Sequence, residues 1–273
     1  MPELPEAETI AADLRDRIRG AVVRAVSVPR PDILCGTDPR AFEGRLRGRR
    51  LARIGRRGKN VLFELDDGGR VLVNLGMTGR LITSDAPNAA EMRHVAARFA
   101  LEDGRDLLFD DTRRFGRIEV LEPDAWRARD ALLGLEPLSA AFTADALRSL
   151  TRRSRSPIRN WLLDQRFVAG VGNIYANEAL FRAGVRPRRG ARTLRRSESD
   201  ALHGGLREVL ARAVEERGTT LRDYLGGGGE AGGFRPRLRV YGRAGEACLA
   251  CATPIKRVVF GNRSAFYCPR CQR

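Results

Sequence analysis

The sequence predicts a multidomain α+β protein with three parts. A β-rich N-terminal domain, about 1–125, is capped by a first helix, a helical domain covers about 135–225, and a short cysteine-bearing hairpin covers 235–273. Three observations support this division. Short apolar runs separated by glycine and aspartate dominate the first part, helical periodicity dominates the second, and four of the five cysteines fall in the last 26 positions. A chain of 273 residues is long enough for such a division.

The N-terminal part begins with a predicted helix that starts near Pro5. Proline is tolerated in the first turn of a helix, and acidic residues such as Glu6 suit its positive end. Ile10, Leu14 and Ile18 recur every four residues and mark one buried face. This helix is expected to cover the β-rich domain.

Two β-hairpins are predicted downstream of this helix. Val61–Leu65 and Arg70–Leu75 flank an Asp-Asp-Gly-Gly turn, and His94–Leu101 and Arg105–Phe109 flank Glu-Asp-Gly. Residues up to about 125 are therefore expected to form a β-rich domain.

Helical patterns dominate after Glu122-Pro123. They occupy Pro157–Arg166, Ile174–Ala183, Glu198–Arg217 and Thr220–Leu225. The following stretch, Gly226–Gly233, has no period and predicts a loop.

The charge balance indicates a polyanionic partner. The chain has 50 Lys and Arg residues against 34 Asp and Glu residues, a net charge of +16. Such an excess favours binding to nucleic acid, because contact with phosphates releases condensed counterions. No apolar stretch is long enough to span a bilayer, and the N-terminus lacks the apolar core of an export signal. We therefore expect a cytoplasmic protein, acting as a monomer, with no membrane partner.

The four C-terminal cysteines predict a structural zinc site. Cys248 and Cys251 form one C-x-x-C pair, Cys268 and Cys271 form another, and 16 residues separate the pairs. This spacing is typical of four-thiolate Zn²⁺ sites, in which protein ligands fill the whole tetrahedron and leave no position for chemistry. The remaining cysteine, Cys35, is expected to be an inert small residue.

Six motifs follow one another along the chain. Each is weak alone, but their order is specific. The motifs are Pro2-Glu3-Leu4-Pro5-Glu6, Arg57-Gly58-Lys59, Leu75-Gly76-Met77-Thr78-Gly79, Arg113-Arg114-Phe115-Gly116, Gly170-Val171-Gly172-Asn173-Ile174-Tyr175-Ala176, and the cysteine hairpin preceded by Val240-Tyr241-Gly242-Arg243. Together and in this order, the motifs resemble the formamidopyrimidine-DNA glycosylase and endonuclease VIII family over essentially the full length. The resemblance implies an N-terminal β-sandwich, a helix–two-turn–helix element and a zinc-ribbon hairpin.

The resemblance also implies a base-excision-repair enzyme that flips out and excises a damaged base in double-stranded DNA and then cleaves the strand by β,δ-elimination. Removal of Met1 would expose the secondary amine of Pro2 as the nucleophile, with Glu3 as general acid/base. Glu6 becomes a second catalytic or structural acid, although it also has the position of a dipole-favoured carboxylate. Lys59 is one of only two lysines in an arginine-rich chain, which indicates that a compact ammonium is needed there. The resemblance implies that it contacts the phosphate next to the lesion, and a plain surface lysine is the alternative.

Further residues are assigned to DNA binding by the same resemblance. Met77, Arg113 and Phe115 would fill the space left by the flipped nucleotide, face the orphaned base and wedge between base pairs. Core packing is the alternative for Met77 and Phe115. Asn173 and Arg263 would grip phosphate, although Asn173 also has the position of a helix N-cap.

The branch of the family is indicated by the N-terminal motif and by the glycine-rich loop. Leu4 and the loop Gly226–Gly233 are more similar to enzymes for oxidised purines, that is, formamidopyrimidine and 8-oxoguanine. Asn74 and Thr112 depart from the residues that relatives often carry there, His and Pro, and could alter opposite-base preference. Three alternatives stay open: an endonuclease VIII-like enzyme for oxidised pyrimidines, a lyase acting only on abasic sites, and a zinc-ribbon protein that binds damaged DNA without catalysis.

Overall fold

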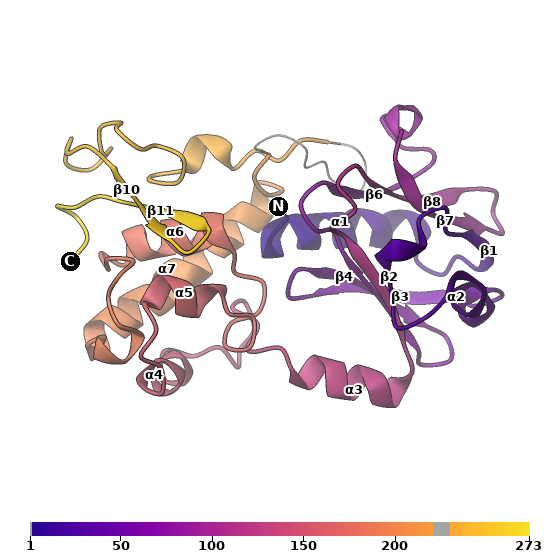
Figure 1. Cartoon of the computed structure of the whole chain (residues 1–273), viewed down its shortest axis with the longest axis horizontal. Helices are drawn as coiled ribbons and strands as arrows, with labels where there is room; N and C mark the ends of the chain where they lie inside the picture. The colour runs from indigo at the N-terminus through magenta and orange to yellow at the C-terminus, as the bar shows by residue number, and fades with distance from the viewer. Residues whose placement is uncertain (1, 221–229) are drawn as a thin grey trace. The chain divides into compact units, whose positions relative to one another are not determined.

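The fold was examined in a computed structural model that describes residues 2–220 and 230–273. The chain forms two compact units (Figure 1). One runs to Leu132 and includes Glu216–Arg235, and the other comprises Leu133–Glu215 and Pro236–Arg273. The expected helix over Thr220–Leu225, apart from its first residue, and the first half of the expected loop over Gly226–Gly233 lie outside the described residues.

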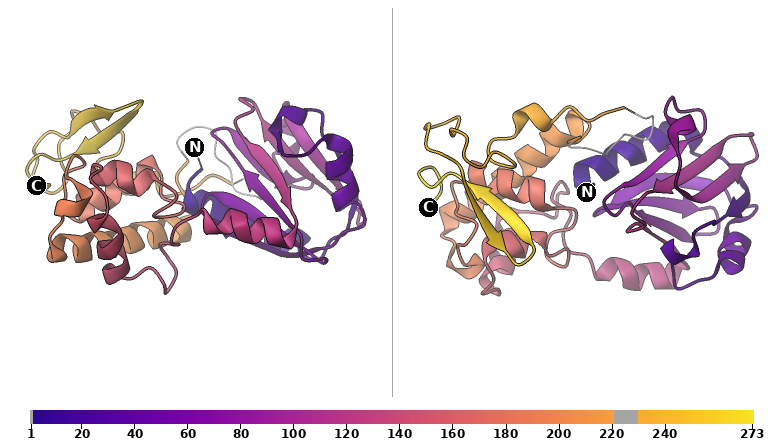
Figure 2. Two further views of the ribbon diagram at one scale, coloured as in Figure 1. Left: turned by 60° about the horizontal axis from the view of Figure 1, so that its bottom comes forward. Right: turned by 45° about the horizontal axis from the view of Figure 1, so that its top comes forward.

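The first unit is a sandwich of two sheets, as expected (Figure 2). The four-stranded sheet has the order β1-β7-β8-β6, and its strands are β1 (Val23–Ser27), β6 (Gly79–Thr83), β7 (Val95–Leu101) and β8 (Asp106–Asp111). The five-stranded sheet has the order β2-β9-β5-β4-β3, and its strands are β2 (Leu34–Cys35), β3 (Leu51–Arg57), β4 (Asn60–Leu65), β5 (Arg70–Asn74) and β9 (Arg117–Leu121). Only β2 and β9 pair in parallel; the other pairs are antiparallel. Both predicted hairpins are present, as β4–β5 and β7–β8.

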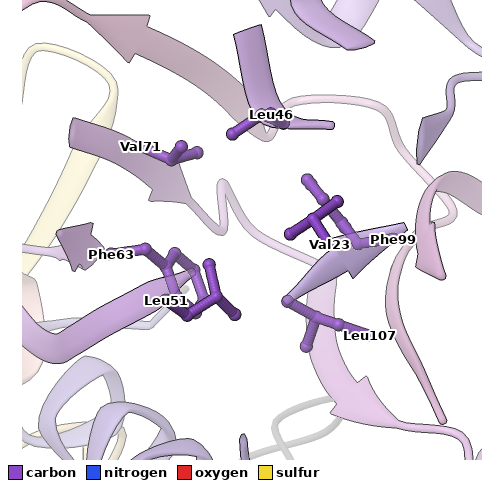
Figure 3. Close-up of a pocket in the computed structure, with 7 residues that line it drawn as sticks. All are labelled: Val23, Leu46, Leu51, Phe63, Val71, Phe99 and Leu107. Carbon is purple, nitrogen blue, oxygen red and sulfur yellow. The ribbon is translucent and has the colours of Figure 1, made fainter. Parts of the chain in front are cut away.

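The core of this unit lies between the inner faces of the two sheets. Figure 3 shows side chains from both sheets and from α2 (Pro39–Leu46) pointing toward a common apolar space. A cavity of about 10 Å³ remains there, too small and too apolar to order water. Its lining residues are Val23, Leu46, Leu51, Phe63, Val71, Phe99 and Leu107. The sandwich is thus a packed scaffold, and its chemistry must lie at its ends and loops.

Helix α1 (Leu4–Ile18) covers the sandwich and packs against β3 and β4. Ile10, Leu14 and Ile18 are completely buried in the same cluster as the sheet residues, as their spacing predicts. Arg15 adds a polar tie by donating from Nε to the carbonyl oxygen of Ile54, at 2.8 Å. The body of α1 is therefore fixed to the scaffold by both apolar and polar contacts.

The second unit is helical and carries a two-stranded hairpin. Its helices are α4 (Ala144–Arg152), α5 (Ile158–Leu163), α6 (Asn173–Arg182) and α7 (Arg196–Glu215), and its strands are β10 (Lys256–Phe260) and β11 (Arg263–Tyr267). The hairpin lies beside α6 (Figure 2). Three helices were not expected from the sequence: α2, α4 and α3 (Pro123–Ala131), the last of which belongs to the first unit. None of the helices in the described part of the chain is long and apolar enough to cross a membrane.

Glu178 on α6 holds the segment that leads to the hairpin. Its carboxylate accepts hydrogen bonds from the backbone N–H groups of Arg239, Val240 and Tyr241, at 2.8–3.0 Å. The Glu178 side chain is only 3% exposed and its bond to the Val240 N–H is buried, so water cannot readily replace the carboxylate there. One buried acid thus satisfies three donors of a loop that has no ladder partner.

Replacing Glu178 with alanine is expected to lower the free energy of unfolding by at least about 2 kcal/mol, because buried donors lose their acceptor. Glu208→Ala is the matched control, since Glu208 forms a surface ion pair with Arg182 and its loss should cost less than about 1 kcal/mol. Urea denaturation of both variants measures the difference. Equal losses would contradict the role given to Glu178.

Candidate active site and nucleic-acid interface

The first turn of α1 brings together three of the residues expected to be catalytic. Pro2 is buried, and Glu3 and Glu6 are each 1% exposed. The Glu6 carboxylate accepts the backbone N–H of Glu3 at 2.8 Å through Oε2 and that of Thr219 at 2.7 Å through Oε1. Glu6 therefore fixes the chain end and the segment around Thr219 to the same turn.

Gly218 makes this attachment possible. Its φ is +82°, and a Cβ atom at this position would lie 2.9 Å from Cγ and Oε1 of Glu6. A side chain here would push the segment away from the carboxylate. A glycine is thus required both by the backbone conformation and by the close approach.

Lys59 lies half-buried in the turn between β3 and β4. Arg56 connects this turn to α1, because its Nε donates to Glu8 at 3.0 Å and its Nη1 donates to the carbonyl oxygen of Gly58 at 2.9 Å. Arg56 thus sets the position of the Lys59 turn relative to the helix that begins with Glu3 and Leu4.

The structure brings Met77, Arg113 and Phe115 together at the surface of the first unit. The Arg113 guanidinium lies 4.6 Å from the centre of the Phe115 ring, and its Nη1 is 3.4 Å from Sδ of Met77. Met77 is 41% exposed and Phe115 is 50% exposed. Core packing, the alternative interpretation of these two residues, is therefore wrong.

Asp111 holds the two loops that carry this exposed cluster, and sequence reasoning missed it. It is 1% exposed; its Oδ1 accepts the Thr78 hydroxyl at 2.6 Å, and its Oδ2 accepts the Gly116 N–H at 2.7 Å. A Cβ atom on Gly76 would lie 2.6 Å from the backbone of Phe115 and Gly116. The backbones of the two loops therefore pack directly against each other. The sequence signal for Asp111 was weak: an acidic residue just after the predicted strand Arg105–Phe109.

In the second unit, Asn173 has a different local role from the one that its position suggested. The N-cap of α6 is Gly172, and Asn173 is the first helical residue, so the N-cap interpretation is wrong. Its side chain points to the hairpin instead, donating from Nδ2 to the carbonyl oxygen of Ser264 at 3.0 Å. This bond joins Asn173 to Ser264, the residue that follows Arg263.

Arg159 completes this arrangement, and it too was missed. It is 2% exposed and donates to Oδ1 of Asn173 at 2.6 Å and to the carbonyl oxygen of Ser264 at 3.3 Å. Within the described residues no carboxylate forms an ion pair with it. Burial lowers the pKa of the Arg159 guanidinium, and the charge of Arg263 lowers it further. Two uncompensated cations at one place provide a strong local positive potential.

The four cysteines cluster as a zinc site requires. Their Sγ atoms all lie within 4.8 Å of one another, with 4.0 Å between Cys248 and Cys271 and 3.4 Å between Cys251 and Cys268. Four thiolates around one zinc ion have sulfur atoms roughly 3.8 Å apart, given a Zn–S distance of about 2.3 Å. The residues therefore fit one structural Zn²⁺, and this prediction is confirmed.

Comparison with known families covers all parts of the chain. Family models match the formamidopyrimidine-DNA glycosylase N-terminal domain over residues 1–118, the formamidopyrimidine-DNA glycosylase H2TH domain over 133–224, and a zinc finger found in these enzymes and in IleRS over 245–273. The chain therefore belongs to the formamidopyrimidine-DNA glycosylase family.

Individual relatives agree over the full length. The formamidopyrimidine-DNA glycosylases of Chloroflexus aggregans and Thioalkalivibrio sulfidiphilus are 42% and 44% identical to this chain, covering all of it and 98% and 100% of their own lengths. Among solved structures, the protein from Thermus thermophilus has a TM-score of 0.88 at 42% identity, covering 99% of this chain and 98% of its own. The Lactococcus lactis enzyme in complex with abasic-site DNA has a TM-score of 0.89 at 31% identity, covering 99% of both chains.

Replacing Cys268 with serine is expected to reduce the zinc content from one ion per chain to none at micromolar protein, because a closed four-thiolate site loses one ligand. Cys35→Ser, which changes the cysteine outside the cluster, should retain one zinc. Elemental analysis of both purified variants measures this. Retention of full zinc by Cys268→Ser would contradict the assigned ligand set.

Proposed function

We propose that this protein is a bifunctional DNA glycosylase and abasic-site lyase that removes oxidised purines through the amine of Pro2. The observation that carries the proposal is the turn at the start of α1, where Pro2, Glu3 and Glu6 are buried together. A nucleophile at a chain end needs a rigid turn, and the two backbone hydrogen bonds to Glu6 supply it. The full-length relationship to glycosylases supports the same conclusion.

The chemistry follows from a secondary amine. After loss of Met1, the lone pair of the Pro2 nitrogen attacks C1′ of the damaged nucleotide, and the glycosidic bond breaks with its electrons leaving on the base. The amine nitrogen then loses its proton, and the sugar ring opens: the C1′–O4′ bond breaks with its electrons on O4′, which takes up a proton, and a C1′=N iminium forms. This iminium withdraws electrons from the sugar and acidifies the C2′ proton. Loss of that proton expels the 3′ phosphate, and a second elimination releases the 5′ phosphate.

Three side chains support these steps. Glu3 donates a proton to the opening sugar and accepts protons later. Lys59 holds the phosphate beside the lesion with a compact ammonium. Glu6 has both oxygens taken by backbone N–H groups, so we assign it the structural role, that of orienting Pro2 and Glu3.

Strand distortion is assigned to the exposed cluster. The damaged nucleotide must leave the stack for C1′ to be reached. Met77 fills the resulting space, Arg113 donates to the orphaned base, and Phe115 wedges between base pairs. Their large exposed area in the free protein is then the area that enters DNA.

The phosphate grip is assigned to the second unit. Asn173 with the N-terminal amides of α6, and Arg263 at the start of β11, contact the backbone of the same duplex. Arg159 positions both elements, because one guanidinium bonds the Asn173 side chain and the Ser264 carbonyl. We accordingly assign catalysis to residues 1–125, DNA binding to the helical part, 135–225, and the zinc site to the hairpin, 235–273. The three parts act within one monomer.

The substrate class is assigned to oxidised purines on the N-terminal motif. A related Lactococcus lactis protein has been solved with DNA containing Fapy-dG, and also with DNA containing an oxidised pyrimidine. An enzyme for oxidised pyrimidines is therefore the second candidate. We place the protein in the cytoplasm, where DNA is present and thiols stay reduced for zinc.

Borohydride trapping tests the nucleophile. Reduction of the iminium should link protein to duplexes carrying 8-oxoguanine or an abasic site, and less to dihydrouracil. Pro2→Gly and an uncleavable N-terminal extension should bind the same DNA but trap poorly, since the extension turns the amine into an amide. Normal strand cleavage by the extended protein would overturn the mechanism, and preferred trapping of dihydrouracil would favour the second candidate.

Replacing Arg263 with glutamine tests the phosphate grip. The slope of log affinity against log salt concentration should fall by about 1, with similar loss on damaged and undamaged duplexes, because one phosphate contact disappears. Arg166→Gln is the control, since Arg166 is exposed and pairs with Asp164. Binding isotherms at several salt concentrations measure both slopes. An unchanged slope for Arg263→Gln contradicts the assignment.

A further inference from the structure

Two asparagines occupy the paired ends of β4 and β5. Asn60 is the first residue of β4, Asn74 is the last of β5, and they stand directly opposite each other. Directly opposed residues in an antiparallel pair project their side chains from the same face. Asn60 is 7% exposed and Asn74 is half-buried. Beyond this pair the β4–β5 ladder ends, so the segments that continue from it lose their mutual backbone hydrogen bonds.

A chain of side-chain hydrogen bonds continues where the ladder stops. The Gly76 N–H donates to Oδ1 of Asn74 at 3.0 Å, and Nδ2 of Asn74 donates to Oδ1 of Asn60 at 2.9 Å. Nδ2 of Asn60 then donates to the carbonyl oxygen of Arg57 at 3.0 Å. Because one end can only donate and the other can only accept, each amide has a single allowed orientation, and hydrogen bonds aligned in this way reinforce one another.

The two ends of this chain lie in segments that the proposed function uses. Arg57 begins the turn that carries Lys59, and Gly76 precedes Met77. A Cβ atom on Gly76 would lie 2.6 Å from the Phe115 backbone, so the Gly76 end of the chain of hydrogen bonds lies close to the loop that carries Phe115. We infer that Asn60 and Asn74 form a positioning bridge that keeps the Lys59 turn and the Met77 loop in one register. Phosphate contact and filling of the vacated space are then coupled at the same nucleotide.

The residue type agrees with this role. A carboxylate at 74 would accept from Gly76 but would place an oxygen against Oδ1 of Asn60. A carboxylate at 60 would face the Arg57 carbonyl in the same way. Asparagine provides one donor and one acceptor at each position, without a charge that would repel the phosphate held by Lys59. The inference rests on the proposed function, because it couples two parts of that reaction.

The test compares Asn60→Ala, Asn74→Ala and the double variant with Val73→Ala. Val73 is fully buried beside Asn74 on β5, so its truncation weakens the same strand and leaves the bridge intact. Single-turnover excision on an 8-oxoguanine duplex gives the rate, and urea denaturation gives the stability. Each asparagine variant should lower the rate about tenfold, as expected for the loss of one or two hydrogen bonds that position reacting groups.

The Asn60→Ala/Asn74→Ala double variant, and Met77→Ala made with and without Asn74→Ala, test whether the two asparagines act together and whether they act through the Met77 loop. If one bridge is responsible, the double variant should be no slower than the slower single variant. Met77→Ala should also cost less in the Asn74→Ala background than in the native protein. Val73→Ala should lose stability with little change in rate.

The outcomes separate the bridge from the function on which it rests. If the native protein gives neither excision nor a trapped adduct, the proposed function fails. If the native protein excises the base but both single variants stay within about twofold of it, the bridge is wrong. Multiplicative losses in the double variant, or an equal rate loss in Val73→Ala, also overturn the bridge and leave the function in place.

Discussion

The proposed reaction depends on holding the N-terminal turn in one position. Terminal residues are normally poorly ordered, and a nucleophile there would be useless unless the fold fixed it. Here α1 starts within two residues of Pro2, and its apolar face is buried against the sandwich. Glu6 then uses both carboxylate oxygens on backbone donors, one from Glu3 and one from Thr219. The second donor comes from a segment more than 200 residues away along the chain, so the N-terminus is stabilised by the completed fold.

Other irregular segments are also fixed by a buried side chain that hydrogen-bonds to their backbone. Asp111 binds the two loops of the exposed cluster, Glu178 binds the segment before the zinc hairpin, and Gln272 joins the Cys268 N–H to the carbonyl oxygen of Val185. In each case a buried side chain satisfies backbone groups that no ladder reaches. Loops can therefore stay irregular while their backbones stay ordered.

Positive charge is distributed in two ways. Many arginines form surface ion pairs with nearby acids, such as Arg182 with Glu208, and these contribute little to stability. Arg113 and Arg159 are different, because their contacts in the described structure are with an aromatic ring, a sulfur atom or neutral oxygens. The net charge of the chain thus explains general attraction to DNA, whereas in the proposed function these two arginines help to fix where the duplex is held.

The sequence by itself determined the elements whose signals are local. The four-residue spacing in α1, the turns of both hairpins and the cysteine pairs are all encoded within short windows, and the structure contains each of them. The exposure of Met77 and Phe115 could also be anticipated from the flanking glycines and arginines. Helices α2, α3 and α4 were not anticipated, since their short patterns are weak without the neighbours that they contact.

Only the tertiary structure decided which side chains act on which backbone groups. Asparagine is a residue type typical of helix N-caps, and the sequence position of Asn173 suggested that role. In the structure its side-chain amide instead bonds to the hairpin, because folding brings Ser264 close to it from 91 positions away. Arg159, Asp111 and the Asn60–Asn74 bridge carry no motif, for a hydrogen bond between distant segments leaves no periodic trace in the sequence. At the N-terminus, the sequence identified Pro2, Glu3 and Glu6 as one group. The fold showed that both carboxylate oxygens of Glu6 accept backbone hydrogen bonds. One of these bonds comes from Thr219, and Gly218 allows the close approach that it needs.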